Sequence, residues 1–481
     1  MRRKNPSEIF CILQECAFPF FTQTTLGRIH AMRYKKIILS VFLFYPERNK
    51  LFMLTRLHLS SSDFWLSLEA SLAERASEET SVGPVVADMI ARVRKEGDAA
   101  LLEYTSRFDK MDYTPHTMRV THSEIDAAVA ACDPSITEAL HLAAERIRVF
   151  HEKQLPENLD YIDAQGVRLG MQWTPITDVG MYVPGGLATY PSSVLMNGIP
   201  ARVAGVDRLV MVVPTPRGEM NPSVLVAAKI AGVDEIYKVG GAQAIAALAY
   251  GTNSIPPVFK IVGPGNAYVA EAKRQVFGKV GIDMIAGPSE ILVVADGKNN
   301  PSWIAADLLS QAEHDKEAQS ILITDDEAFA DKVNAALAEM LATLPRREIA
   351  QASLERFGLC IVVPELEAAL PVIDAIAAEH VELAVEHPDP LAARIRNAGA
   401  IFLGRFCPEA LGDYVAGPSH VLPTCRTARF SSGLSVYDFI KKSSIIGVSA
   451  EAFAALAPAT HTLAENEGLG AHARSVSIRS N

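Results

Sequence analysis

The chain has 481 residues, enough for two or more domains with buried cores of their own. Its 56 acidic residues outnumber its 45 lysines and arginines, and the net charge of −11 argues against nucleic acid as a partner, because a polyanion would be repelled. The six cysteines show no paired CxxC spacing, so the sequence predicts neither a disulfide framework nor a thiolate zinc site. A reducing, cytoplasmic compartment is expected.

The first 52 residues differ in character from the rest. They carry nine lysines and arginines against three glutamates. The apolar run 37–45 is far shorter than the roughly 20 residues that span a bilayer, so no membrane segment is expected. The basic composition leaves an organelle transit peptide open, whereas the scarcity of serine and the irregular aromatics favour a disordered or non-native extension before Met53.

The rest of the chain changes from a mostly helical start to an alternating pattern. Residues before Asp178 indicate helices, for example at 137–150, and residues after Phe439 indicate helices again. Between them, short β-branched runs alternate with Ala-rich stretches, which predicts a parallel sheet with helices on both faces. The expected strands are 180–183, 208–213, 259–262, 290–294, 320–324 and 359–363, and the expected helices include 223–231, 242–250, 267–276, 327–344 and 371–378.

This pattern predicts an α/β protein of two Rossmann-like, doubly wound lobes with helical terminal extensions. The glycine- and proline-containing turns at 184–186 and 286–289 are hinge candidates, which would make 182–287 an inserted second lobe. The first lobe would then comprise 53–181 and 288–438, and 439–481 would form a C-terminal tail. A small ligand is expected in a cleft between such lobes.

Two glycine-rich turns between a predicted strand and a predicted helix could meet a phosphate through backbone N–H groups. They are Val262-Gly-Pro-Gly-Asn266 and Val239-Gly-Gly-Ala-Gln243. Neither has all three glycines of the dinucleotide fingerprint. The alternative for each turn is a tight connection without a ligand.

Polar residues in the C-terminal half predict a metal site with an acid/base pair beside it. Gln311 and His314 are three apart on a run without helix breakers, so on a helix they would share a face. A carboxylate and a second imidazole, for which Asp413 and His472 are candidates, would complete the mixed nitrogen and oxygen set that zinc accepts. The alternatives are a polar helix face, a turn aspartate and a frayed tail.

Glu379 and His380 are the acid/base candidates. Adjacent side chains diverge on a helix or strand, so both could reach one cleft only from a loop or from the end of an element.

These pieces occur in order inside longer segments that together resemble histidinol dehydrogenases. The resemblance extends from about Leu54 to Ile478. The segments that carry it are 263–276, 283–292, 307–314, 379–382, 412–415, 420–424 and 428–436.

The resemblance implies a ligand set and a shared site. One Zn²⁺ per subunit would be held by Gln311, His314, Asp413 and His472. The substrate would be contacted by these four residues and by Ser289, His380, His420 and Glu467, and NAD by Tyr182, Gln243 and Asn266. It also implies a homodimer, with Glu467 and His472 supplied by the partner subunit.

The chemistry implied by the resemblance is oxidation of L-histidinol through L-histidinaldehyde to L-histidine with two NAD⁺. A neutral imidazole suits removal of the alcohol proton, and His380 is assigned to that step. Glu379 would activate the water that hydrates the aldehyde. A cysteine route through Cys407 or Cys425 is the rival mechanism, but neither thiol has an evident base beside it in the sequence.

Two other functions stay open at this point. A related zinc- and NAD-dependent dehydrogenase could oxidise a different polar alcohol, with His420 and Glu467 setting its specificity. A hydrolase or a non-enzymatic protein could share the fold, because function resides in the site.

Overall fold

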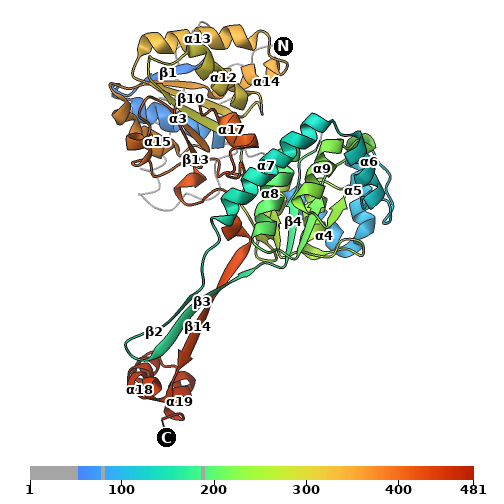
Figure 1. The fold of residues 1–481 in the computed structure, drawn as a ribbon, viewed down its shortest axis with the longest axis vertical. Coiled ribbons are helices and arrows are strands. Elements are labelled where there is room, and N and C mark those ends of the chain that lie inside the picture. Colours follow the sequence, from blue (N-terminus) through green and yellow to red (C-terminus); the bar gives the residue numbers. More distant parts are fainter. Residues whose placement is uncertain (1–52, 77–81, 186–189, 481) are drawn as a thin grey trace, which may run out of the picture. The chain divides into compact units, whose positions relative to one another are not determined.

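Two parallel sheets and a smaller antiparallel sheet form the framework of the chain, which a computed structural model describes over residues 53–76, 82–185 and 190–480 (Figure 1). The predicted α/β class is confirmed. The extension expected at 1–52 and Gly186 of the first hinge lie outside the described residues. No helix within these three ranges combines the length and the apolar character that a membrane span requires.

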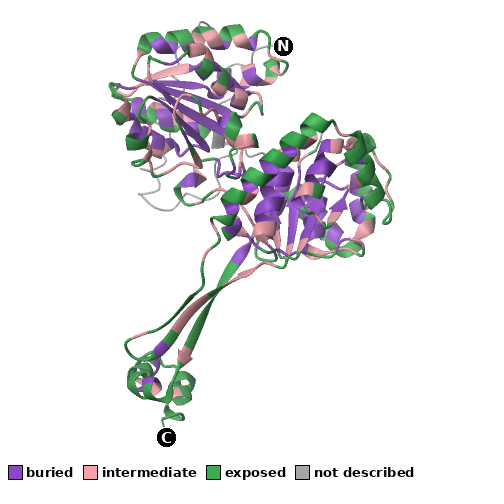
Figure 2. Cartoon of the chain, in the orientation of Figure 1, coloured by how far each residue is buried: buried purple, intermediate pink, exposed green. Residues whose placement is uncertain are grey.

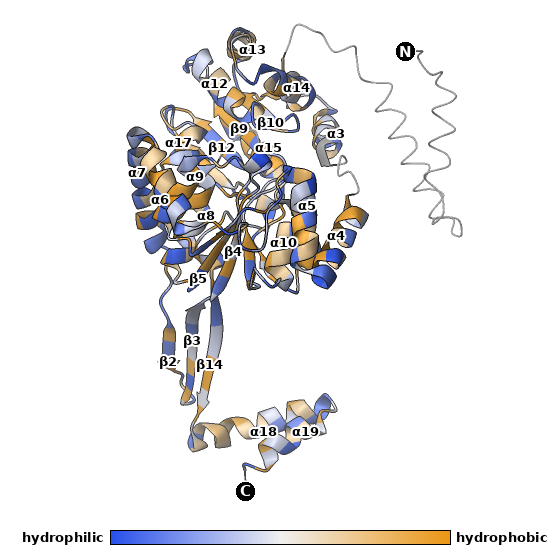
Figure 3. Cartoon of the chain, turned by 90° about the vertical axis from the view of Figure 1, so that its right-hand side faces the viewer, coloured by the Kyte–Doolittle hydropathy of each residue, from blue (hydrophilic) through white to orange (hydrophobic). Residues whose placement is uncertain are grey.

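The first parallel sheet has six strands with helices on both faces. Apolar side chains of α3 (Phe64–Ala76) and α15 (Leu370–Ile376) pack on one face, and those of α12 (Pro301–Ala312), α13 (Glu327–Leu341) and α14 (Arg347–Phe357) on the other. Its inner strands are buried and contain apolar runs, such as 291–295 on β9 and 321–323 on β10, as sheets covered on both sides require (Figure 3). The strand order is β1 (Thr55–His58), β11 (Leu359–Val362), β10 (Gln319–Thr324), β9 (Glu290–Ala295), β12 (His380–Ala384) and β13 (Ala400–Leu403).

The second parallel sheet has five strands. One face is covered by α6 (His122–Ala131), α7 (Pro134–Glu152), α8 (Pro191–Val203) and α9 (Pro222–Ala231), and the other by α4 (Gly83–Glu96), α5 (Asp98–Asp109), α10 (Gly241–Tyr250) and α11 (Ala267–Val276). The strand order is β6 (Glu235–Tyr237), β5 (Arg208–Val212), β4 (Asp178–Tyr182), β7 (Lys260–Val262) and β8 (Gly281–Ile282).

Helices α4 to α7 share the cores of this second sheet, although the sequence analysis grouped residues 53–181 with the first lobe. Their apolar faces are buried against α8 to α11, whereas β1 and α3 join the first sheet. Packing across the sheet therefore decides where these helices belong. The limits at residues 182 and 288 stay predictions.

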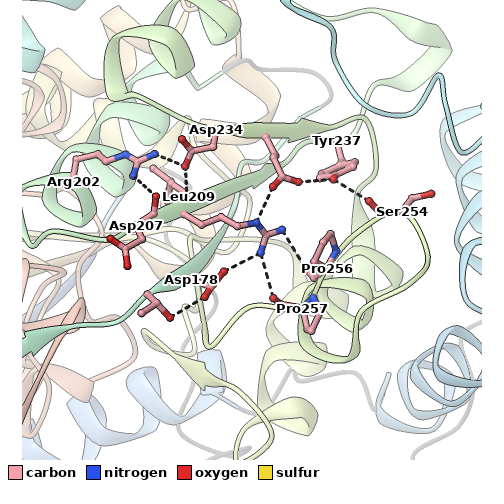
Figure 4. Close-up of polar contacts among 12 residues, drawn as sticks. Asp178, Arg202, Asp207, Leu209, Asp234, Tyr237, Ser254, Pro256 and Pro257 are labelled. Carbon is pink, nitrogen blue, oxygen red and sulfur yellow. Dashed lines mark hydrogen bonds and ion pairs between the residues drawn. The ribbon is translucent and has the colours of Figure 1, made fainter.

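Arg208 connects the amino ends of three strands of the second sheet, and Figure 4 labels its partners Asp178, Pro256 and Pro257. Its Nε lies 2.7 Å from Glu235 Oε1 on β6, and its Nη1 lies 3.2 Å from Asp178 Oδ1 on β4. The Tyr237 hydroxyl donates to the other Glu235 oxygen at 2.6 Å. This network braces the edge opposite to the glycine-rich turns.

The antiparallel sheet corrects the prediction that the chain is helical directly after Phe439. Strand β14 (Ile440–Val448) pairs with β3 (Val167–Pro175), which also pairs with β2 (Leu159–Ile162). Most of β14 is exposed, so its sequence lacks the alternation that marks a half-buried strand (Figure 2). The expected helices follow it as α18 (Ala450–Asn466) and α19 (Gly470–Ser477).

Candidate active site

The acid/base candidates lie at the amino edge of the six-stranded sheet. Glu379 directly precedes β12, and His380 is its first residue. His380 is paired in register with Ile291 on β9, which places Glu379 beside Glu290. The half-buried Ser289 precedes β9. Glu379 and His380 therefore lie at the end of a strand, which is a position from which two adjacent side chains can both reach one cleft.

Glu290 and Glu379 orient each other through their backbones. The Glu290 N–H donates to Glu379 Oε2 at 3.0 Å, and the Glu379 N–H donates to Glu290 Oε2 at 3.2 Å. The Cys425 N–H donates to the other Glu290 oxygen at 2.9 Å. Both carboxylates are buried, so these bonds offset part of their desolvation. Glu290 was not among the sequence candidates. An acidic residue at the start of a fully buried strand is unusual, and this feature could have marked it as a site residue.

His380 is held as a neutral base. Its Nδ1 lies 2.9 Å from the Glu290 carbonyl oxygen, an acceptor, so Nδ1 carries the proton and Nε2 keeps its lone pair. Nε2 is buried without a hydrogen-bond partner and lies 3.8 Å from Asp413 Oδ1. Burial lowers the pKa of His380 to about 4, so the ring is neutral near pH 7.

Gln311 and His314 are neighbours at the end of α12. The helix ends at Ala312, so the expected helical face does not continue to His314. Instead, a turn in which the His314 N–H donates to the Gln311 backbone carbonyl places His314 near Gln311. Gln311 Nε2 lies 3.1 Å from His314 Nδ1, and Gln311 Oε1 is buried without a partner. Burial lowers the pKa of His314, and the nearby Asp413 carboxylate partly opposes this. The two side chains therefore offer neutral donors close to Asp413.

Asp413 lies on α17 (Glu409–Tyr414), and His420 follows on the next loop. His420 Nδ1 lies 3.0 Å from the Asp413 carbonyl oxygen, and its Nε2 lies 3.1 Å from Ser193 Oγ on α8. His420 thus connects the acidic end of the site to the second sheet's helices. Ser193 was not among the sequence candidates.

Three further acids that the sequence analysis missed lie behind His380. Glu409 Oε1 is 3.6 Å from His380 Nδ1, and Ser310 Oγ donates to Glu409 Oε2 at 3.3 Å. The Glu409 N–H donates to Glu382, whose carboxyl shares a hydrogen bond with Asp307. Burial raises the pKa of Glu409 and of Glu382 well above the usual range, and raises that of Asp307 to about 6. Burial therefore disfavours the ionised form of all three acids, and Asp307 becomes mostly ionised above about pH 6.

Two overlapping sets of donor atoms meet at Asp413. His380, Glu409 and Asp413 each offer an atom within 4.8 Å of the others. The predicted ligands Gln311 and His314 contact each other, and His314 is near enough to the same carboxylate for its charge to act on the imidazole. Each set contains a buried atom that lacks a hydrogen-bond partner and that a bound cation would satisfy: His380 Nε2 in the first set and the Gln311 amide oxygen in the second.

Glu467 and His472 are the predicted site residues that the single chain does not bring to this cluster. Glu467 caps the C-terminus of α18, and His472 lies on α19. Both are exposed. Within the part of the chain that is described, no hydrogen bond or ion pair joins either side chain to the residues around Asp413.

The predicted cofactor residues gather at the carboxyl edge of the second sheet. Strand order reverses between β4 and β7, which is where open α/β sheets bind ligands. Tyr182 ends β4, and its hydroxyl accepts the Gly241 N–H at 3.2 Å. Gln243 in the first turn of α10 is buried with Oε1 unpartnered, and Asn266 caps α11. Both glycine-rich turns open onto this edge.

A family model for histidinol dehydrogenase matches residues 72–480 of the chain. This chain belongs to the histidinol dehydrogenase family. A histidinol dehydrogenase of Rhodospirillum rubrum is 61% identical over 427 residues, which cover 89% of this chain and 98% of that protein. One from Mesorhizobium japonicum is 60% identical over 429 residues, covering 89% and 100%.

The structural comparison agrees with the sequence comparison. The crystal structure of a histidinol dehydrogenase from Elizabethkingia anophelis matches with a TM-score of 0.85 at 37% identity, covering 89% of this chain and 98% of that one. The predicted membership of the histidinol dehydrogenase family and the oxidoreductase class are therefore confirmed.

Proposed function

We propose that this histidinol dehydrogenase family member oxidises L-histidinol through L-histidinaldehyde to L-histidine and reduces two NAD⁺ in doing so. The observation that carries the proposal is the neutral His380, whose Nε2 is buried without a hydrogen-bond partner and lies 3.8 Å from Asp413 Oδ1, while its Nδ1 lies 3.8 Å from Glu379 Oε2. A hydrolase reaction uses no nicotinamide, and membership of a dehydrogenase family argues against hydrolase activity.

The first step needs a base at the alcohol. Hydride leaves the carbinol carbon readily only as the hydroxyl proton is removed, and His380 Nε2 is the acceptor. The Nδ1–H bond to the Glu290 carbonyl keeps the lone pair on Nε2 while the proton arrives. The two hydrides leave the same carbon, so one base position serves both steps.

The second step needs water on the aldehyde. Glu379 would accept a proton from water as the oxygen adds to the carbonyl carbon, giving the hydrate that loses the second hydride. The Glu290 N–H holds one Glu379 oxygen in place. A carboxylate oriented by backbone donors keeps its geometry while its protonation changes.

Zinc fits the set Gln311, His314 and Asp413, with His472 of the partner subunit as the fourth protein ligand. The supporting observation is the buried, unpartnered Gln311 oxygen beside a neutral His314. Glu409 of the alternative set fits a cation less well, because burial raises its pKa and so disfavours the carboxylate form that a cation binds. When bound, the ion would supply a positive charge that positions the substrate's amine and imidazole nitrogens. Ser289, His420 and Glu467 are proposed as further substrate contacts.

NAD is proposed to bind at the β4/β7 edge, contacted by Tyr182, Gln243 and Asn266. The unpartnered Gln243 amide oxygen and the two glycine turns support this placement.

A homodimer with shared sites is proposed, because it would explain why Glu467 and His472 lie outside the cluster around Asp413 in the single chain. The antiparallel sheet and the helices after it expose large apolar side chains in the single chain, among them Ile162 and Ile446, each about 70% exposed. Such a surface is typical of one that a partner covers. A second subunit would then bring its own Glu467 and His472 to the acidic cluster.

The test is a stopped assay of purified protein with histidinol and NAD⁺, with and without a chelator, alongside metal analysis. We expect zinc near one equivalent per subunit and about two NADH per histidinol, with histidine as product and loss of rate on chelation. NADH formed only from a different alcohol would select a related dehydrogenase. No NADH from any alcohol would overturn the proposal.

A further inference from the structure

Charged side chains bond both backbone polar groups of Gly263, the residue that follows β7. The Gly263 N–H donates to Asp283 Oδ2 at 2.8 Å, and the Lys273 ammonium donates to the Gly263 carbonyl oxygen at 3.0 Å. Asp283 and Lys273 also form an ion pair with each other. The three residues therefore close a ring of charged hydrogen bonds around the backbone of a single residue.

The ion pair between Lys273 and Asp283 is almost completely buried, which a gain in stability alone does not explain. The side chains of Lys273 and Asp283 are 2% and 1% exposed. Taking two charges out of water is costly, and apolar residues of similar size are often equally stable or more so. A buried pair is therefore better explained when it specifies one local conformation.

The conformation that it specifies is the turn after β7. Gly263 has φ +106°, and a side chain there would collide with the Tyr182 carbonyl oxygen at the end of β4. The turn then leads to Asn266, whose side chain caps α11 through the N–H groups of Tyr268 and Val269. Clamping Gly263 thus sets the distance between β4 and the N-terminus of α11.

The two residues flanking this turn, Tyr182 and Asn266, are the ones proposed to contact NAD. The clamp lies behind the turn, with Lys273 on the buried face of α11 and Asp283 just after β8. Both charged side chains are buried, and they contact Gly263 and each other.

We propose that Lys273 and Asp283 are positioning residues that preorganise the Gly263–Asn266 turn for the dinucleotide. This inference rests on the proposed NAD site. A turn that is already ordered loses less entropy when the ligand binds, so the clamp contributes to affinity without touching the ligand.

The experiment compares two double variants by calorimetric titration with NAD⁺ alone, with histidinol alone, and by thermal unfolding. Lys273→Met with Asp283→Leu removes charges and hydrogen bonds but keeps the volume. Lys273→Gln with Asp283→Asn removes the charges and keeps a donor and an acceptor for Gly263, although the Gln donor is one atom closer to the backbone than the Lys ammonium. We expect the apolar variant to bind NAD⁺ about tenfold more weakly and the amide variant to stay within about threefold of wild type. Histidinol affinity should not change in either.

The matched control is the exposed pair Lys298 and Glu386, replaced by Met and Leu in the same way. Its NAD⁺ affinity should equal that of wild type. An apolar clamp variant that is folded and binds NAD⁺ as wild type does would overturn the inference. If that variant does not fold, Lys273→Met with Asp283→Asn takes its place under the same criterion. Wild-type protein that binds no NAD⁺ would instead refute the proposed function.

Discussion

Asp413 and His380 face each other across the start of β12, with Oδ1 of the carboxylate 3.8 Å from Nε2 of the imidazole. The separation is longer than a hydrogen bond, so neither atom satisfies the other. The proposed base and a predicted metal ligand therefore lie next to each other, and a substrate hydroxyl beside the pair would be within reach of both.

His380→Asn should abolish both oxidation steps. Asn retains an amide that can donate to the Glu290 carbonyl but has no basic nitrogen to take up the alcohol proton, so we expect kcat to fall by roughly 10²–10⁴-fold. Zinc content should be unchanged. The exposed His387→Asn serves as the control. Retention of more than a tenth of wild-type kcat in His380→Asn would remove the histidine from the proposed role.

Glu379→Gln should separate the two steps. The Gln oxygen can still accept the Glu290 N–H, so the position of His380 is preserved, but the base that activates water is lost. We expect aldehyde oxidation to fall by about 10²-fold or more while oxidation of histidinol to the aldehyde is reduced far less. Single-turnover NADH formation from histidinol and from histidinaldehyde measures the two steps. An equal loss in both would count against the assignment.

Mixed dimers test the shared site. His380→Ala and His472→Ala proteins should each be inactive, but a dimer with one chain of each has one site with both histidines intact. Random reassociation should therefore restore about a quarter of wild-type activity. The readout is the NADH rate after co-expression or mixing from denaturant. Lack of restored activity in isolated mixed dimers would show that His472 acts within its own chain or not at all.

Asp307 should make stability depend on pH. Burial raises its pKa to about 6 from 3.8, so between these values the folded chain holds a proton that the unfolded chain has lost. The free energy of unfolding should then decrease as pH rises from about 4 to about 6 and stay lower above it. Asp307→Asn should be more stable than wild type at pH 7, by on the order of 1 kcal/mol after solvent screening.

The measurement for Asp307 is denaturant unfolding at several pH values and one fixed protein concentration, because a dimer's stability depends on concentration. The exposed Glu339→Gln on α13 is the control and should run parallel to wild type. An Asp307→Asn curve with the same pH slope as wild type would show that the carboxyl titrates normally.

Cys407→Ala and Cys425→Ala should both retain turnover within about threefold, because no cysteine is needed for proton removal by His380 and Glu379. Cys425 is exposed, and its thiol packs against Gly287. Steady-state rates and histidine yield provide the check. Loss of aldehyde oxidation in either variant would favour the thiohemiacetal route.

The amino-acid sequence by itself predicts most of the regular structure in the α/β part. The six expected strands and the helix at 267–276 match the observed elements closely, because runs of β-branched residues and Ala-rich stretches are local signals. Strand β14 escaped prediction because Ile440-Lys-Lys-Ser-Ser-Ile-Ile is stabilised by pairing with β3, not by a buried face. Motif order alone also predicted the family, which the comparisons confirm.

The location of the candidate site was decided only by the tertiary structure. General rules for α/β sheets point to the carboxyl edge, where the Tyr182 and Gly263 turns lie, but Glu290, Glu379 and His380 meet at the amino edge of the other sheet. Glu290 and Glu379 are 89 residues apart, and the register of β9 with β12 makes them neighbours. Glu409 reaches His380 through the placement of α17. Local sequence specifies elements, whereas contacts between distant residues arise from packing, and the chemistry of this site depends on such contacts.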